Sequence, residues 1–334
     1  VAPVLQFNKV TLINGKFNYF NRNLPKPSER DFNENNFEFR AINGDLQDFT
    51  IIEDSLTFTI KDLSSTEKSG LTITHFEANS IISRSIMQFE NLQLTTPKSR
   101  LQNKLLFKYT SYNDFSDFFN AIWIDANLQN SKIHLQDIAF FSDILKKYND
   151  EILASGKVTG YTKDLKIENG QISIGQHTTF AGDAQVKNIP YTDNLNIQFT
   201  NGQVSTIAKK FSAFIDWNAP EEFLRLDKIK YNGSFNGGLQ KFVNKGLIET
   251  SLGNCDVDLD LDLTDESYEA VLVSDNLNLG KMLAVNHLGT TAFDLAINGQ
   301  GLNLQKLKSG IKGNIAFVEY NDYRYTDIAV NGAV

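Results

Sequence analysis

Apolar and polar residues alternate one by one along most of this chain. Leu56, Phe58 and Ile60 alternate with Thr57 and Thr59, and similar stretches recur near residues 195, 257, 293 and 315. A period of two places successive side chains on opposite faces of a β-strand. Strands buried on both faces contain continuous apolar runs instead, and such runs are scarce here. The pattern therefore predicts a mainly β protein whose strands have one apolar and one polar face.

The apolar positions that share a phase form the candidate inner lining. The clearest members are Leu56, Phe58, Ile60, Leu195, Ile197, Phe199, Val257, Leu259, Leu261, Leu263, Phe293, Leu295, Ile297, Ile315 and Phe317. The further members are Leu71, Ile73, Leu105, Phe107, Ile328 and Val330. Periodicity leaves two arrangements open. Either the apolar faces close on each other as a packed sandwich or β-helix, or the sheet curls and leaves an apolar trough.

Helix signals are few. Residues 137–148 carry Ile138, Phe141, Ile144 and Leu145 at helical spacing, which predicts one short amphipathic helix. Residues 114–122 and 203–215 are two further candidates for short helices. So few helices leave little material to cover the apolar faces of the strands.

The dipeptide Asn-Gly occurs eight times, beginning at residues 14, 43, 169, 201, 232, 236, 298 and 331. Because both residues tolerate positive φ, Asn-Gly is a strong signal for a hairpin turn. Several of these dipeptides are 31 to 33 residues apart. The sequence thus predicts a repeating unit of about 30 residues, as in solenoid-like stacks.

No Pro/Ser-rich linker divides the chain. Residues 21–36, with Pro25 and Pro27, are expected to form a loop that leaves the sheet. We therefore expect a groove segment over 1–136, the short helix over 137–148 and groove repeats over 149–334. Strand-like patterns begin at Val1 and continue to Val334, so we expect the chain to be an excerpt of a longer protein.

Composition excludes several functional classes. The 334 residues are 41% hydrophobic, enough to order the chain, and the net charge is −8. This charge argues against nucleic-acid binding, which needs a basic surface, and against a polybasic grip on anionic headgroups. The one cysteine, Cys255, allows no intramolecular disulfide. Cys255 shares a phase with Val257, which predicts an inward-facing, inert thiol.

No motif indicates catalysis. Asp256, Asp258, Asp260 and Asp262 resemble a calcium site, but side chains at i and i+2 of a strand are about 7 Å apart and do not converge on one ion. The aspartates are therefore expected on the solvated face of a strand. No G-x-S-x-G, Walker or H-E-x-x-H motif occurs, so we expect neither an enzyme nor a bound cofactor or metal.

The second half contains four distinctive motifs, I-K-Y-N-G-S-F-N-G-G from Ile229, S-D-N-L-N-L-G-K-M-L from Ser274, H-L-G-T-T-A-F-D-L-A-I-N-G from His287 and E-Y-N-D-Y-R-Y-T-D-I-A-V-N-G from Glu319. Their order resembles the TamB family of the AsmA-like superfamily, particularly its Bacteroidota members. The segment I-D-A-N-L-Q-N-S-K-I-H-L-Q-D-I-A-F-F from Ile124 resembles the family's strand, strand, short-helix step. The resemblance covers about residues 120–334. Residues 1–120 share only the Asn-, Phe- and Lys-rich composition of these family members.

The resemblance implies a sheet folded lengthwise into an apolar groove, and bridge-like transport of phospholipid between the inner and outer membranes. It also implies a periplasmic location, an N-terminal inner-membrane anchor outside these residues and a missing C-terminal region that meets an outer-membrane barrel protein of the BamA/TamA family. Phospholipid acyl chains would then contact the candidate lining. The alternative is a β-rich periplasmic scaffold that assists outer-membrane protein assembly or secretion.

Overall fold

Antiparallel β-strands dominate the structure, a computed structural model that describes residues 4–20, 32–33, 36–141, 143–189, 194–301 and 308–333. The chain divides into unit 1 (1–175 and 186–192) and unit 2 (176–185 and 193–334). The mainly β fold class is thereby confirmed. The expected helical segment at 137–148 lies inside unit 1. Most of the expected loop at 21–36 lies outside the described residues.

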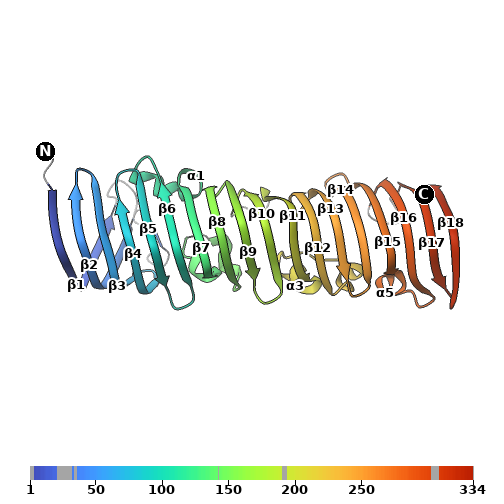
Figure 1. Ribbon diagram of the computed structural model, residues 1–334, viewed down its shortest axis with the longest axis horizontal. Coiled ribbons are helices and arrows are strands. Elements are labelled where there is room, and N and C mark those ends of the chain that lie inside the picture. The colour runs from blue at the N-terminus through green and yellow to red at the C-terminus, as the bar shows by residue number, and fades with distance from the viewer. Residues whose placement is uncertain are drawn as a thin grey trace. The chain divides into compact units, whose positions relative to one another are not determined.

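Unit 1 is an antiparallel meander, in which each strand pairs with the next one along the chain (Figure 1). Its strands are β1 (Val4–Phe20), β2 (Asn36–Ile52), β3 (Ser55–Glu67), β4 (Thr72–Ile82), β5 (Ile86–Thr95), β6 (Arg100–Lys108), β7 (Trp123–His134), β8 (Glu151–Tyr161) and β9 (Asp164–Ile174).

Unit 2 repeats this arrangement. Its strands are β10 (Thr178–Lys187), β11 (Asn196–Ile207), β12 (Lys228–Gly237), β13 (Lys241–Thr250), β14 (Gly253–Asp262), β15 (Ser267–Asn278), β16 (Leu288–Gln300), β17 (Lys308–Tyr320) and β18 (Tyr323–Ala333). From β11 to β18 each strand pairs antiparallel with the next. β10 lies beside β11, where the Thr178 and Thr206 hydroxyl oxygens are 2.7 Å apart.

The described helices are short and join strands. They are η1 (Tyr112–Asp117), α1 (Phe118–Ala121), α2 (Leu135–Ile138), η2 (Asp143–Lys147), α3 (Ala208–Phe214), α4 (Glu221–Leu224) and α5 (Leu279–Leu283). The helix predicted over 114–122 is confirmed as η1 followed by α1. Five α-helices occur in the described residues, more than the one to three expected.

Two helix predictions need correction. Residues 137–148 do not form one helix, because the Gln136 side chain donates to the carbonyls of Lys146 and Tyr148 and holds α2 and η2 as separate turns. The helix expected from residue 203 begins only at Ala208. Residues up to Ile207 remain in β11, where they pair with β12.

The Asn-Gly dipeptides do not form hairpin turns. All eight lie inside strands, so this prediction is wrong. Asn14, Asn169 and Asn201 have positive φ, and each lies where the register with a neighbouring strand shifts. The tolerance of asparagine for positive φ therefore serves β-bulges, which bend a strand and increase its twist.

Bulges with positive φ recur through unit 1. Each odd-numbered strand carries one in its middle, at Asn14, Asp62, Asn91, Asn130 and Asn169, all with φ between 46° and 51°. The register of pairing shifts at each of them. The even-numbered strands β2 and β6 also have positive-φ residues at register shifts, namely Ala41, Asp48 and Asn103.

The polar face of unit 2 carries cross-strand ion pairs. Lys241 Nζ lies 2.9 Å from Asp262 Oδ2, and Lys245 Nζ lies 2.7 Å from Asp258 Oδ2; each lysine is directly opposite its aspartate. The hydrogen bond from Lys241 lowers the pKa of Asp262 to about 2. The aspartate row thus lies on a solvated face, as the sequence predicts.

Mid-strand glycines of unit 2 allow a direct test of how tightly its strands pack. A Cβ on Gly246 would lie 2.3 Å from the Asn232 carbonyl oxygen and 2.6 Å from Gly233 Cα. A Cβ on Gly332 would meet only Ile311 Cγ2, at 3.9 Å. We expect Gly246→Ala to lower the free energy of unfolding by about 1–3 kcal/mol, and Gly332→Ala to change it by less than about 0.5 kcal/mol. Equal effects in chemical denaturation would contradict this packing.

The Lys241–Asp262 pair predicts a titration result. Lys241→Met should raise the pKa of Asp262 from about 2 toward its ordinary 3.8, whereas Lys245→Met, which removes the neighbouring pair, should not. The ion pair favours the carboxylate, so its contribution to stability is present above pH 3.8 and is lost as the pH falls through about 2. Carboxyl NMR titration of the three proteins measures this, and an unchanged Asp262 pKa in Lys241→Met would refute the pairing.

Candidate apolar groove

An unbroken apolar row crosses all nine strands of unit 1. Residues directly opposite on paired antiparallel strands lie on the same face. The pairings connect, strand by strand, Leu5, Ile51, Leu56, Ile82, Met87, Phe107, Ile124, Gly160 and Leu165. This set is called row 1. It contains no polar side chain.

A second row, row 2, runs beside row 1 on the same face. It connects Phe58, Ser80, Phe89, Leu105, Ala126, Val158 and Ile167. The register between β2 and β3 shifts near this point, but ring contacts continue the row. The Phe49 ring centroid lies 5.7 Å from that of Phe58 and 6.2 Å from that of Phe7. The apolar surface therefore reaches β1 despite the bulges.

Unit 2 has corresponding rows. Row 3 connects Phe199, Phe235, Asn244, Leu259, Ala270, Ile297, Ile311 and Gly332. Row 4 connects Gly202, Gly233, Gly246, Val257, Leu272, Leu295, Gly313 and Val330. Shorter rows add Ile197, Gly237, Phe242, Leu261 and Tyr268 on one side, and Ser274, Phe293, Ile315 and Ile328 on the other. One polar residue, Asn244, interrupts row 3.

Aromatic rings form the first part of this surface in unit 2. Phe180, Phe199, Phe235 and Phe242 follow one another across β10 to β13, with successive ring centroids 5.3, 5.9 and 5.4 Å apart. From β14 onward the rows are largely aliphatic. The lining thus changes from aromatic to aliphatic along the unit.

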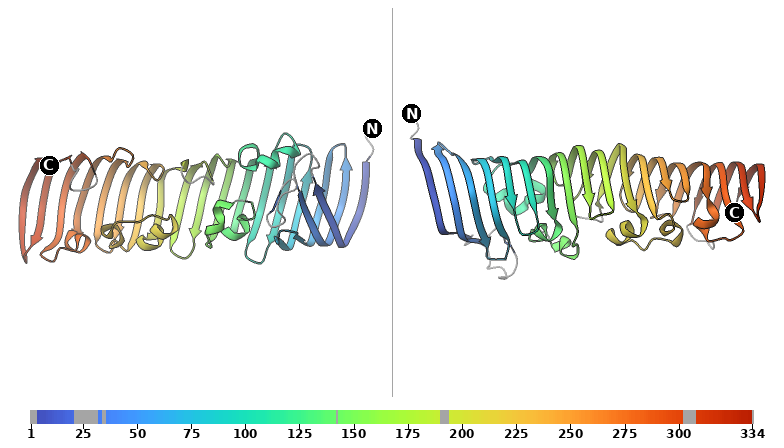
Figure 2. Two further views of the ribbon diagram at one scale, coloured as in Figure 1. Left: turned by 180° about the vertical axis from the view of Figure 1, so that it is seen from behind. Right: turned by 60° about the horizontal axis from the view of Figure 1, so that its bottom comes forward.

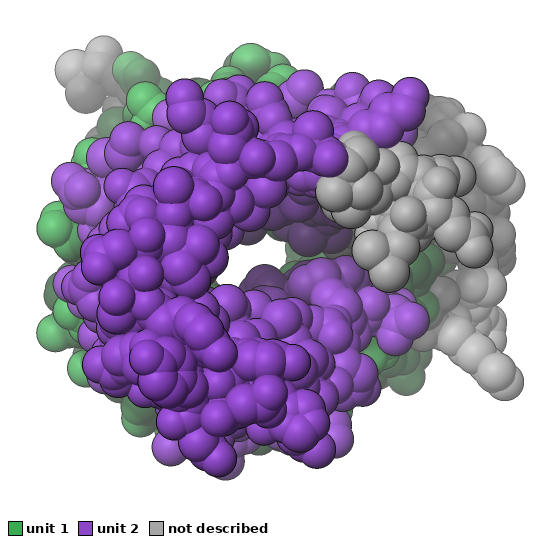
Figure 3. Space-filling model, turned by 90° about the vertical axis from the view of Figure 1, so that its right-hand side faces the viewer, with its two compact units in different colours: residues 1–175, 186–192 green, residues 176–185, 193–334 purple. Residues whose placement is uncertain are grey.

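The apolar face of unit 2 borders a hollow. Viewed from the end, unit 2 curves around a central opening (Figure 3). The opposite face, with Lys241 and Lys245, is open to solvent, since 69% and 76% of these side chains are exposed. Rows 3 and 4 lie on the other face, so we assign the hollow to them. Together these rows form the candidate groove of unit 2.

Most of the predicted lining residues are partly exposed to solvent. Ile60, Leu71, Val257 and Phe293 are less than 10% exposed, Leu263 is 39% exposed, and the other sixteen are half-buried. A packed core would enclose most of such side chains completely. Partial exposure on a concave face is the burial expected for the wall of an open groove.

Most of the predicted lining residues lie in the rows, but six do not. Ile60 pairs with Leu46 and Ala78, beside row 2 on the same face. Leu71 and Leu195 immediately precede β4 and β11, and Leu263 follows β14 in a turn. Ile73 pairs with Ser65 beyond the bulge of β3. Phe317 lies next to the shorter row, with the Arg324 guanidinium 4.1 Å from its ring centre. Leu71, Leu195 and Leu263 continue the alternating sequence pattern although they lie just outside the strands.

Several residues of the rows were not predicted from the sequence. Met87, Phe235, Phe242, Leu272 and Ile311 all belong to the rows or their continuation. Met87 and Phe89 do alternate with polar residues, so the same signal could have identified them. Leu272, in contrast, lies between Val271 and Val273, which are exposed on the polar face and hide the alternation.

The protein's own helices cover one part of row 1. The Phe107 ring centroid lies 6.3 Å from that of Phe115 in η1 and 5.6 Å from that of Phe118 in α1. Tyr112 of the same segment donates its hydroxyl to the Ser83 carbonyl. The η1–α1 segment therefore packs on the apolar face and is anchored to the turn between β4 and β5.

A chain of helices follows one edge of unit 2 (Figure 2). α3 and α4 lie between β11 and β12, and α5 lies between β15 and β16. The two insertions meet where Arg225, which caps α4, donates Nη1–H to the Met282 carbonyl of α5 at 2.9 Å. This contact connects segments four strands apart along the edge.

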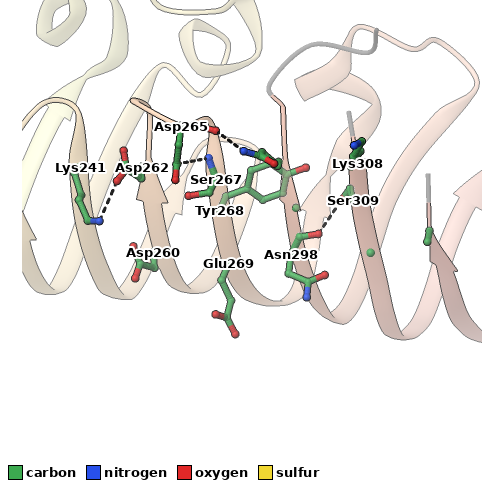
Figure 4. Close-up of a pocket in the computed structure, with 14 residues that line it drawn as sticks. Lys241, Asp260, Asp262, Asp265, Ser267, Tyr268, Glu269, Asn298, Lys308 and Ser309 are labelled. Atoms are coloured by element: carbon green, nitrogen blue, oxygen red, sulfur yellow. Dashed lines mark hydrogen bonds and ion pairs between the residues drawn. The ribbon is translucent and has the colours of Figure 1, made fainter. Parts of the chain in front are cut away.

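A polar hollow of about 690 Å³ lies elsewhere in unit 2, around the ends of β13 to β17 (Figure 4). Lys241, Asp262, Glu269, Gln300 and Lys308 contribute to it. Lys241 pairs with Asp262, and the Asp265 carboxylate accepts a hydrogen bond from the Ser267 N–H at 3.0 Å (Figure 4). No group of three or more His, Cys, Asp or Glu side chains among the described residues could hold a metal ion.

Cys255 lies on the apolar face of β14. It is directly opposite Ile248, two residues from Val257, and it is half-buried. Burial, with a smaller contribution from the Asp256 charge, raises the pKa of its thiol to about 11. The thiolate that reacts as a nucleophile is therefore scarce near neutral pH.

Comparison with known proteins adds no assignment. No protein-family model matches the chain, and neither the curated proteins nor the solved structures include a significant match. No helix in the described part of the chain is long and apolar enough to cross a bilayer.

Proposed function

We propose that this protein carries phospholipids along its apolar rows, as a segment of a bridge between two membranes. The observation that supports this most directly is the continuity of the rows. Row 1 crosses nine strands without a polar side chain, and row 3 crosses eight with one. A binding site for one small molecule would need only a local pocket, whereas carriage requires a continuous path.

The length of the rows fits passage better than a single site. Paired strands lie about 4.8 Å apart, so row 1 extends about 38 Å across its nine strands and row 3 about 34 Å across its eight. An acyl chain in one leaflet spans about 15 Å, half the hydrocarbon thickness of a bilayer. Each unit therefore offers a path longer than the ligand that it would carry.

The energetics explain why such a path is useful. A phospholipid with two chains of about 15 methylenes exposes them to water at about 0.8 kcal/mol per CH₂, or about 24 kcal/mol in total. Contact with an apolar wall removes most of this cost, while the headgroup can stay in water at the open side. Carriage of this kind needs no covalent step.

The location and partners of the protein are part of the same proposal. The motif resemblance to the TamB family supports a periplasmic position, anchorage at the inner membrane and contact with an outer-membrane barrel protein of the BamA/TamA family through regions outside this chain. The net charge of −8 is consistent with recognition of acyl chains rather than of anionic headgroups or nucleic acid.

Adding a charge to the groove tests the proposal. Leu261 is half-buried next to Tyr268 and Phe242, so in an open groove Leu261→Arg should lower the free energy of unfolding by less than about 1 kcal/mol and abolish phospholipid binding. The matched control is Val243→Arg on the polar face, where the side chain is 43% exposed. This control should retain both stability and lipid.

Thermal melts and native mass spectrometry of bound phospholipid measure the two properties. A loss of several kcal/mol in Leu261→Arg would indicate a filled core. Absence of phospholipid from the unaltered protein after exposure to vesicles would instead favour the alternative, a scaffold that assists protein assembly.

A further inference from the structure

One side chain in row 3 is polar although its neighbours are apolar. Asn244 lies in row 3, directly opposite Phe235 on β12 and Leu259 on β14. Its neighbours two residues away on the same strand and face are Phe242 and Gly246. The amide is therefore surrounded by phenyl rings and an aliphatic side chain.

The Asn244 side-chain oxygen has no hydrogen-bond donor among the described residues, although it is buried. Two other polar groups on this face of unit 2 are paired. The Tyr231 hydroxyl donates to the Ser234 carbonyl at 2.7 Å, and the Ser274 hydroxyl donates to the Asn254 carbonyl at 2.6 Å. A buried acceptor without a donor costs free energy, so an unpaired one calls for an explanation.

Asn244 also differs from the other buried, unpaired side-chain oxygens of the described residues. Ser80 and Thr291 are only 3% and 2% exposed and are closed off by the protein, and Ser69 lies in the turn between β3 and β4. Asn244 is half-buried and belongs to a row that borders the hollow. Asn244 thus lies in the wall that a ligand in the groove would contact.

We infer that Asn244 is a specificity-determining residue that recognises a hydroxyl group on the acyl chain of the lipid in the groove. This inference rests on the proposed function. A plain methylene chain offers no donor and leaves the acceptor unpaired. A hydroxyl on the chain donates to the amide oxygen and can accept from the amide nitrogen, so both partners are satisfied.

Charged groups are poor candidates for the same position. A phosphate or carboxylate beside Asn244 would be surrounded by Phe235, Phe242 and Leu259, with no cation on that face of β13. Burial of an unpaired charge costs far more than burial of a hydroxyl. The nearest lysines on the strand, Lys241 and Lys245, lie on the opposite face and pair with aspartates. The geometry thus favours a neutral donor.

Binding of two matched fatty acids tests the inference. The probes are octadecanoate and 12-hydroxyoctadecanoate, whose hydroxyl lies far from the carboxylate, measured by isothermal titration with the unaltered protein, Asn244→Leu and the control Asn232→Leu, whose asparagine is exposed on the polar face. The unaltered protein and the control should prefer the hydroxylated chain by about fivefold, the effect of one net hydrogen bond. Asn244→Leu should bind both chains equally, with octadecanoate gaining affinity.

Each other outcome is decisive. Equal affinities in the unaltered protein, or a preference that survives in Asn244→Leu, would overturn the role of Asn244 and leave the groove intact. Failure of the unaltered protein to bind either chain would overturn the proposed function itself. Should Asn244→Leu fail to fold in a thermal melt, Asn244→Ala, which removes the amide without adding volume, replaces it under the same expectations.

Discussion

The register between neighbouring antiparallel strands is the constraint on which the apolar rows depend. A slip of one residue would move every inward side chain of a strand to the solvent face. The structure keeps this register on both sides of its bulges, and the positive-φ residues of unit 1 lie on every odd-numbered strand and also on β2 and β6. Row 1 therefore continues from Leu5 to Leu165, although the sheet bends several times between them. Cross-strand ion pairs such as Lys245–Asp258 fit the same register on the polar face.

Both faces use the same alternating sequence pattern, but with different chemistry. On the polar face of unit 2, Lys245 and Lys241 pair with Asp258 and Asp262, two of the four aspartates of β14. On the apolar face, phenyl rings from β10 to β13 give way to aliphatic side chains. In unit 1, the Phe115 and Phe118 rings pack on Phe107. The groove is consequently not uniform, and the helical insertions are the elements able to cover it locally.

The sequence predicts the strands and much of the lining, because alternation depends only on local spacing. Leu259, Leu295 and Ile297 lie in the rows for that reason. The role of Asn-Gly could not be predicted in the same way, since positive φ at Asn201 suits a bulge as well as a turn and only long-range pairing decides between them. The break between α2 and η2 depends on hydrogen bonds of Gln136 to residues ten and twelve positions away. Asn244 gave no local signal, because its importance comes from Phe235 and Leu259 on neighbouring strands.

Site-specific photocrosslinking tests the central claim most directly. A benzophenone amino acid would replace either Leu259, in row 3, or Asp260, the next residue on the same strand and on the exposed polar face. After irradiation with phospholipid vesicles, mass spectrometry should detect a covalent phospholipid adduct at position 259 and not at position 260. Adducts at both positions, or at neither, would show that acyl chains do not lie selectively along the apolar rows.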